Sequence, residues 1–340
     1  MSGKSETPEK IRVSAGSAIV LSLLSGRIDA KPTTAYLLTY HDGKCTANCM
    51  FCPQARSSRG RADMLSRVTW PAFQLKDVVK GIGKAVKSGE LKRVCIQALN
   101  YPGVFKDILS MVSSILSGIN VPISVSCQPL RQENLEKLKH AGVERVGIPL
   151  DAATKEIFER IKGRNADGPY RWEDQVKILL EAVKVFGKDA VSTHLIVGLG
   201  ETEKEMIQRI QWCVDNAIFP ALFAFTPISG TKLEGLPQPS IESYRRIQLG
   251  HYLITREISR FEDFMFNRME KIVDFGVESK LLRNVIESGE PFLTSGCPNC
   301  NRPYYNERPG GPLYNYPRPL RKDEVEKIKS ILLKDTEIHL

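Results

Sequence analysis

Residues 45–52 read Cys45-Thr46-Ala47-Asn48-Cys49-Met50-Phe51-Cys52 and carry three cysteines. They follow an apolar run at residues 35–39 that predicts a β-strand. Three thiolates at this spacing can each bind one iron of a 4Fe–4S cube and leave the fourth iron open. A structural zinc site uses four ligands, and this stretch supplies three. The stretch therefore predicts an iron–sulfur site directly after a strand, with a zinc site or a disulfide as the alternative.

Working outward from this stretch, short apolar runs alternate with longer segments of helical periodicity. The predicted strands are residues 35–39, 93–97, 122–127, 145–149, 191–197 and 221–225. The predicted helices are residues 70–88, 106–116, 132–141, 172–186 and 203–216. This alternation predicts an α/β fold, a partial (βα)6 TIM-like barrel whose chemistry lies at the carboxyl ends of its parallel strands.

Three parts are expected along the chain. Residues 1–30 are predicted to be a helical N-terminal extension, residues 31–235 the barrel, and residues 236–340 a C-terminal part. The C-terminal part should contain helices at residues 241–266, 278–288 and 321–333, with a loop between the last two. That loop, rich in Pro, Gly and Tyr, holds a second cysteine motif, Cys297-Pro298-Asn299-Cys300.

Composition excludes some classes of protein. The chain has 340 residues, 42% of them hydrophobic and 26% charged, which is ordinary for a globular protein. No apolar run is long enough for a membrane helix, and no cleavable signal is recognised, so a cytoplasmic protein without membrane association is expected. In a reducing compartment, eight cysteines indicate metal binding or catalysis. The net charge of +9 suits acidic partners.

The C-x3-C-x2-C spacing, with Phe51 before the last cysteine, resembles the signature of the radical S-adenosylmethionine (SAM) superfamily. This resemblance implies that Cys45, Cys49 and Cys52 are catalytic ligands of a 4Fe–4S cluster that also binds SAM. It further implies a SAM pocket formed by Phe51, Gln97, Ala98, Asp151, Ile196, Gly198, Gly200 and Pro227. Residues 97–98 depart from the GGE-like turn of many members. Asp151 is equally well interpreted as the N-cap of a following helix.

Cys95 and Cys127 end predicted strands and are expected to point into the barrel mouth. Together with Cys297 and Cys300 they would supply four thiolates for an auxiliary 4Fe–4S cluster. Ser295 is an alternative for one of these ligands. Two further alternatives are that Cys95 and Cys127 are buried core thiols, and that the loop holds a separate zinc site.

Strand-end cysteines and the Gly198–Thr202 turn resemble biotin synthase, although Ser192 stands where biotin synthase has a third strand cysteine. The loop at residues 294–305, T-S-G-C-P-N-C-N-R-P-Y-Y, resembles the archaeal two-component lipoyl synthases. That resemblance implies sulfur insertion into an octanoyl chain, with the auxiliary cluster as a sacrificial sulfur source. It implies as partners an octanoylated acidic carrier protein or its lysine peptide, a second radical SAM component and a ferredoxin-type electron donor.

Three other functions remain open. One is sulfur insertion into dethiobiotin, as in biotin synthase, and another is a different radical SAM reaction. The third is a non-catalytic iron–sulfur or zinc protein that binds nucleic acid, which the barrel pattern does not favour. Two further residues are left undecided: His194 is predicted to be a core histidine, and Arg302 to cap a cluster or meet a carboxylate.

Overall fold

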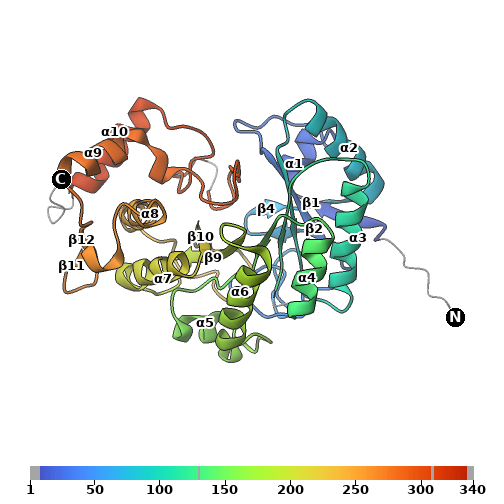
Figure 1. Ribbon diagram of the computed structural model, residues 1–340, viewed down its shortest axis with the longest axis horizontal. Coiled ribbons are helices and arrows are strands. Elements are labelled where there is room, and N and C mark those ends of the chain that lie inside the picture. The colour runs from blue at the N-terminus through green and yellow to red at the C-terminus, as the bar shows by residue number, and fades with distance from the viewer. Residues whose placement is uncertain (1–7, 129–130, 308–309, 335–340) are drawn as a thin grey trace.

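The computed structural model describes residues 8–128, 131–307 and 310–334, and its centre is a curved, mostly parallel β-sheet (Figure 1). The strand order is β10-β9-β8-β7-β6-β2-β1-β5. The six parallel strands are β2 (Thr34–Thr39), β6 (Arg93–Gln97), β7 (Ile123–Ser126), β8 (Arg145–Gly147), β9 (Val191–Val197) and β10 (Ile218–Ala224). They match the six predicted strands, so the predicted α/β barrel class is confirmed.

Helices between these strands pack on the outside of the sheet (Figure 1). They are α2 (Leu75–Lys87), α3 (Val104–Leu116), α4 (Gln132–His140), α5 (Lys155–Ile161), α6 (Trp172–Phe186) and α7 (Glu203–Asp215). α7 begins in a capping box, in which Thr202 and Glu205 satisfy each other's backbone N–H groups. Since helices cover one face of the parallel strands, the opposite face is left to line the barrel interior.

The predicted helical N-terminal extension is wrong for the residues described. β1 (Lys10–Val13) pairs antiparallel with β2 and with β5 (Ala72–Gln74), and only the short α1 (Ala15–Val20) is helical. The β5 pairing also corrects the helix predicted from residue 70, which begins at Leu75. β3 (Met64–Leu65) and β4 (Val68–Thr69) form a small hairpin before it. Strand pairing with distant segments overrides local helical periodicity here.

The C-terminal part contains α8 (Ile241–Thr255), β11 (Met265–Phe266), β12 (Ile272–Asp274), α9 (Ser279–Ser288) and α10 (Lys322–Lys334). The helix predicted over residues 241–266 therefore ends early. Glu257 has a positive φ of 57°, and the Ser259 hydroxyl donates to the carbonyl of Phe275 at 2.8 Å. These contacts turn the chain back toward β12. The boundaries predicted after residues 30 and 235 remain predictions.

The ends of the cysteine-bearing loop are held together at its base. Leu293 and Tyr316 form an isolated parallel bridge, and Thr294 N–H donates to the Tyr316 carbonyl at 3.0 Å. From α8, the buried Arg245 donates to the carbonyls of Leu313 and Tyr314. A guanidinium held by carbonyls fixes the backbone of this segment regardless of the side chains there.

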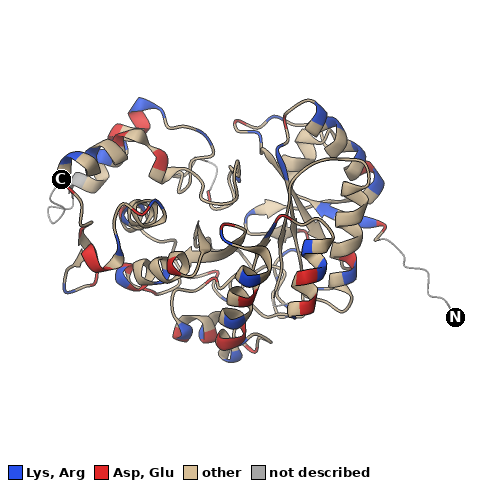
Figure 2. Ribbon diagram, viewed as in Figure 1, with Lys and Arg blue, Asp and Glu red and all other residues tan. Residues whose placement is uncertain are grey.

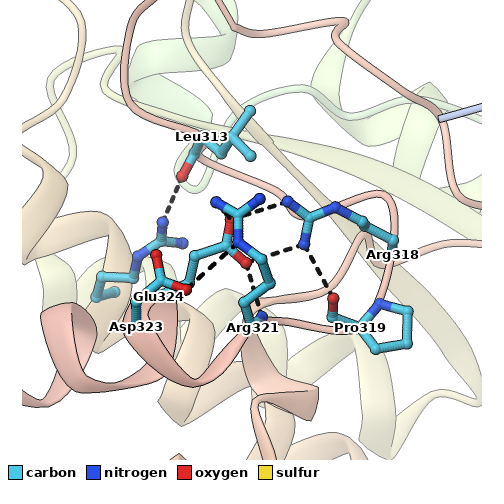
Figure 3. A network of polar contacts seen from close by, with 7 residues as sticks. Leu313, Arg318, Pro319, Arg321, Asp323 and Glu324 are labelled. Atoms are coloured by element: carbon cyan, nitrogen blue, oxygen red, sulfur yellow. Dashed lines mark hydrogen bonds and ion pairs between the residues drawn. The ribbon is translucent and has the colours of Figure 1, made fainter. Parts of the chain in front are cut away.

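Beyond the loop, Arg318 and Arg321 both contact Glu324 at the start of α10 (Figure 3). The hydrogen bonds from Arg318, at 2.9 Å to each carboxylate oxygen, lower the pKa of Glu324 to about 2. This network fixes the start of α10 to the segment that precedes it, residues 318–321.

Charged side chains lie mainly on the outward faces of the helices, with Lys/Arg and Asp/Glu interspersed, and the central strands carry few of them (Figure 2). Among the described residues, no helix combines the length and apolarity that crossing a membrane requires.

A buried ion pair joins the barrel to the C-terminal part. Arg246 of α8 contacts both carboxylate oxygens of Glu203, with N–O distances of 2.6 to 3.1 Å, and both side chains are nearly inaccessible to solvent. Ile272 N–H donates to the same carboxylate at 2.9 Å. One carboxylate thus ties α7, α8 and β12 together.

We expect Glu203→Ala to lower the free energy of unfolding by about 3–5 kcal/mol, because it leaves the Arg246 charge buried without this partner. Urea unfolding of the metal-free chain measures the loss. The matched control is Glu262→Ala, which breaks an exposed pair with Arg260 and should cost no more than about 1 kcal/mol. Equal losses in the two variants would contradict the importance of the buried pair.

Candidate active site

A cavity of about 270 Å³ lies inside the barrel, and both groups of cysteines line it. Its wall takes side chains from β2, β6, β7, β9 and β10. The strand register explains which residues face it: Gln97 is aligned with Leu38 on β2 and with Ser126 on β7, and His194 is aligned with Ala221 on β10. Alternate residues of each strand therefore project inward.

Cys45, Cys49 and Cys52 lie in the loop after β2, and all three line the cavity. Backbone hydrogen bonds hold this loop: Cys45 N–H donates to the Gln54 carbonyl at 2.9 Å, and Cys52 N–H donates to the Cys49 carbonyl at 3.1 Å. The N–H of Asn100, after β6, donates to Cys45 Sγ at 3.1 Å. The loop therefore presents the three thiols in a fixed arrangement.

Burial raises the pKa of each of these thiols, that of Cys52 to about 12. The positive charge of Lys162 opposes this effect and lowers the pKa values of Cys45 and Cys49. Metal coordination takes the place of the thiol proton in such sites. Three inward-facing thiols beside a buried cation fit an anionic iron–sulfur cluster.

Lys162 was not identified from the sequence. Its ammonium, at the end of α5, is fully buried and lies 2.6 Å from Asp151 Oδ2 and 2.8 Å from the Pro149 carbonyl. Asp151 lines the cavity with a strained, positive φ of 66°. The alternative that Asp151 is a helix N-cap is wrong, because α5 begins at Lys155 and Thr154 caps it.

The glycine turn after β9 lies beside the cavity rather than in its wall. Gly198 and Gly200 have φ values of 104° and 112°, and a Cβ on Gly198 would come within 2.8 Å of Pro239. The Glu201 carboxylate accepts the N–H groups of Gly198 and Leu199 at 2.6 and 3.0 Å. Burial raises the pKa of Glu201 to about 6. A single carboxylate thus shapes this turn.

The other residues predicted for a SAM pocket divide into two groups. Phe51, Gln97, Ala98 and Ile196 line the cavity together with Asp151. Of the described residues, Pro227 lies outside the wall, and its neighbour Ile228 lines it instead.

The second cysteine group is brought together from β6 and the C-terminal loop. Burial raises the pKa of Cys95 well above its ordinary value, and the neighbouring thiols of Cys297 and Cys300 raise it further. Cys127 lines the cavity but packs in the apolar core between sheet and helices, and burial alone raises its pKa to about 12. Ser295, the alternative ligand, accepts the Leu222 N–H at 2.8 Å. Within the described residues, no three His, Cys, Asp or Glu are grouped closely enough to hold a single metal ion.

Two hydroxyls that the sequence gave no reason to select contact this group. Tyr36 Oη lies 3.1 Å from Cys300 Sγ, and Ser124 Oγ lies 3.4 Å from Cys297 Sγ. Burial raises the pKa of Tyr36 well above its ordinary value, so its hydroxyl keeps its proton. The contacts join residues far apart in the chain, which is why no local pattern reveals them.

Arg302 and His194 also line the cavity. The Arg302 guanidinium stacks over Phe223 at 3.7 Å and donates to the Leu222 carbonyl at 3.0 Å. The His194 ring also contacts Phe223, with ring centroids 4.8 Å apart, and burial lowers its pKa to about 4. His194 is thus a neutral residue of the cavity wall, which the core interpretation did not anticipate.

Comparison with solved structures supports the fold. The crystal structure of methylornithine synthase matches with a TM-score of 0.54 and 15% identity, covering 92% of this chain and 90% of that one. The FeFe-hydrogenase maturase HydG from Carboxydothermus hydrogenoformans matches with a TM-score of 0.50 and 16% identity. That match covers 79% of this chain and 58% of the maturase, so the chain spans little more than half of its length.

Curated relatives are biotin synthases at low identity. That of Chlamydia pneumoniae is 27% identical over 248 residues, or 70% of each chain. That of Cytophaga hutchinsonii is 25% identical over 275 residues, covering 78% of this chain and 76% of the relative. Residues 40–213 match the family model of the Radical SAM superfamily, and this range includes the Cys45–Cys52 loop, the four parallel strands β6, β7, β8 and β9, and the glycine turn. This chain therefore belongs to the radical SAM superfamily.

Proposed function

We propose that this radical SAM enzyme inserts sulfur into an unactivated C–H bond of a protein-bound octanoyl chain, as one component of a lipoyl synthase. The observation that carries the proposal is the shared cavity: Cys45, Cys49 and Cys52 line it together with Cys95, Cys127, Cys297 and Cys300. Sulfur insertion needs a radical source and a sulfur source that face the same substrate carbon. The biotin synthase relatives support this class of reaction.

In this proposal, Cys45, Cys49 and Cys52 hold the 4Fe–4S cluster to which SAM binds, and Cys95, Cys127, Cys297 and Cys300 hold an auxiliary cluster. When bound, the first cluster and SAM supply a hydrogen-abstracting 5′-deoxyadenosyl radical, and the auxiliary cluster supplies sulfur. Lys162 holds Asp151 Oδ2 and leaves the carboxylate at the cavity wall, where it suits the hydroxyl or ammonium groups of SAM.

The cavity wall suits an alkyl substrate. Leu38, Ile196, Phe223 and Phe225 line it, and such side chains exclude water from a reactive radical. His194 is neutral near pH 7 because burial lowers its pKa to about 4, so it adds no charge to this wall.

An octanoyl group carried on a lysine presents an uncharged chain, which matches the apolar wall. The net charge of +9 supports association with an acidic carrier protein. The second radical SAM component and the ferredoxin-type electron donor are part of the same proposal and rest on the resemblance of the loop at residues 294–305.

A second candidate is sulfur insertion into dethiobiotin, in the manner of biotin synthase. The named relatives favour it. Arg302 also favours it, because a buried guanidinium at the cavity wall suits a substrate carboxylate, which the octanoyl-lysine lacks. Product analysis with an octanoyl-lysine peptide and with dethiobiotin distinguishes the two candidates.

Removing the loop thiols tests the auxiliary cluster. We expect about eight irons per reconstituted wild-type chain and about four in Cys297→Ala/Cys300→Ala, with SAM cleavage retained. Anaerobic iron and sulfide analysis with Mössbauer spectroscopy measures both values.

The matched control is Cys213→Ala, which removes a thiol buried in α7 and should leave about eight irons. About four irons in the wild type would remove the sulfur-insertion proposal and leave a radical SAM enzyme with a single cluster.

The raised pKa of Glu201 predicts a pH dependence of SAM binding. Below about pH 6 this carboxylate becomes protonated and holds the glycine turn less tightly, so SAM affinity should fall. A folded-state pKa above the ordinary value means that Glu201 itself stabilises the fold as the pH drops through this range. Weaker binding there is therefore not unfolding caused by Glu201.

Equilibrium SAM binding to the reconstituted enzyme between pH 5 and 8 measures this effect. In Glu201→Gln, which cannot titrate, the affinity should be reduced at pH 8 and flat through pH 6. The same pH profile in wild type and variant would contradict the assignment to Glu201.

A further inference from the structure

We propose that Tyr36 and Ser124 are positioning residues for the second cysteine pair, each donating its hydroxyl hydrogen to one sulfur: Tyr36 to Cys300 and Ser124 to Cys297. The inference rests on the auxiliary cluster proposed above and concerns how the protein tunes it. It follows from the directions of the hydrogen bonds around these two hydroxyls.

The direction of the hydrogen bond between Tyr36 and Cys300 is fixed by the group that donates to Tyr36. The backbone N–H of Arg302 donates to Tyr36 Oη at 2.9 Å, and an N–H group can only donate. The phenol has one hydrogen of its own, and among the described residues its acceptor is Cys300 Sγ at 3.1 Å. Tyr36 is only 2% exposed, so water does not compete for that hydrogen.

Ser124, on β7, likewise accepts one hydrogen bond and donates its own hydrogen to a sulfur. Arg93 Nη1 donates to Ser124 Oγ at 3.0 Å, and a guanidinium has no acceptor atom. The serine hydrogen is therefore directed to Cys297 Sγ, 3.4 Å away. Arg93 is itself buried and held by Glu144 at 2.7 Å, so the upstream donor is fixed.

We call each of these hydrogen-bond chains a relay: Arg302 to Tyr36 to Cys300, and Arg93 to Ser124 to Cys297. The strand register places the two relays next to each other. Cys95 is aligned with Tyr36 on one side and with Ser124 on the other, so the three side chains form a row across β2, β6 and β7. The loop lays Cys300 and Cys297 against the two ends of this row. One strand thiol and two hydroxyl donors thus face the same pair of loop sulfurs.

Hydrogen bonds to the sulfurs of an iron–sulfur cluster stabilise its more negative, reduced state and raise its reduction potential. Both relays begin at a donor that cannot accept, so neither hydroxyl can turn away without losing a buried hydrogen bond. The expected result is a higher potential and slower iron loss at the auxiliary cluster than the cysteines alone would give.

The test is a redox titration of the reconstituted full-length enzyme, followed by electron paramagnetic resonance, for wild type, Tyr36→Phe, Ser124→Ala and the double variant. Each single variant should shift the potential of the auxiliary cluster to more negative values, and the shifts should add. The potential of the first cluster should not move. Release of iron to a chelator should be several-fold faster in each variant.

Two further variants separate hydrogen bonding from packing. Ser126→Ala removes a hydroxyl from the same strand, two residues further along, and should leave the potential unchanged. Ser124→Thr keeps a hydroxyl and should restore the wild-type potential. Loss of the auxiliary cluster in Ser124→Ala but not in Ser126→Ala would also support the relay.

The outcomes distinguish this inference from the proposed function. About eight irons in the wild type with equal potentials in all variants overturns the relay and leaves the auxiliary cluster standing. About four irons in the wild type overturns the auxiliary cluster, and the inference falls with it.

Discussion

The position of the cysteine-bearing loop depends on hydrogen bonds at the free edge of β10. Leu222 lies on the last strand of the sheet, and no strand of the described residues pairs with its outward N–H and carbonyl. Ser295 Oγ accepts the N–H and Arg302 donates to the carbonyl. At the other end of the gap, Asn301 accepts the N–H of Thr33, just before β2, at 3.1 Å. An unpaired edge is costly, and here the cysteine-bearing loop satisfies it. The loop that covers this edge therefore also carries Cys297 and Cys300 to the cavity.

The cysteines also determine where charged side chains lie in the interior. Thiols taken out of water resist ionisation, and seven cysteines line this one cavity. Each group has a cationic side chain nearby: Lys162 lowers the pKa of Cys49, and Arg302 lowers that of Cys300. Between them, His194 stays neutral. Cationic side chains therefore lie beside both cysteine groups, and apolar side chains such as Leu38 and Phe225 line the same cavity.

Sequence reasoning succeeded where the information is local. The spacing of Cys45, Cys49 and Cys52 predicted the superfamily, and strands flanked by covering helices give continuous apolar runs that are easily recognised. It failed where a distant segment decides: β1 is a strand because β2 and β5 accept its hydrogen bonds, and α8 ends early because residue 259 bonds to residue 275. Lys162, Tyr36 and Ser124 carried no signal for the same reason. The contact of Tyr36 with Cys300 spans 264 positions, and that of Ser124 with Cys297 spans 173.

The bridge between Leu293 and Tyr316 has a consequence for how such a chain can change. It brings the two ends of the cysteine-bearing loop side by side. Arg245 then holds the end of the loop through the carbonyl oxygens of residues 313 and 314, and every amino acid has such an oxygen. Neither anchor depends on the sequence of the loop. Residues between these anchors can therefore vary, in evolution or by design, without loosening the ends of the loop, provided that Ser295, Asn301 and Arg302 keep their bonds to β10 and Thr33.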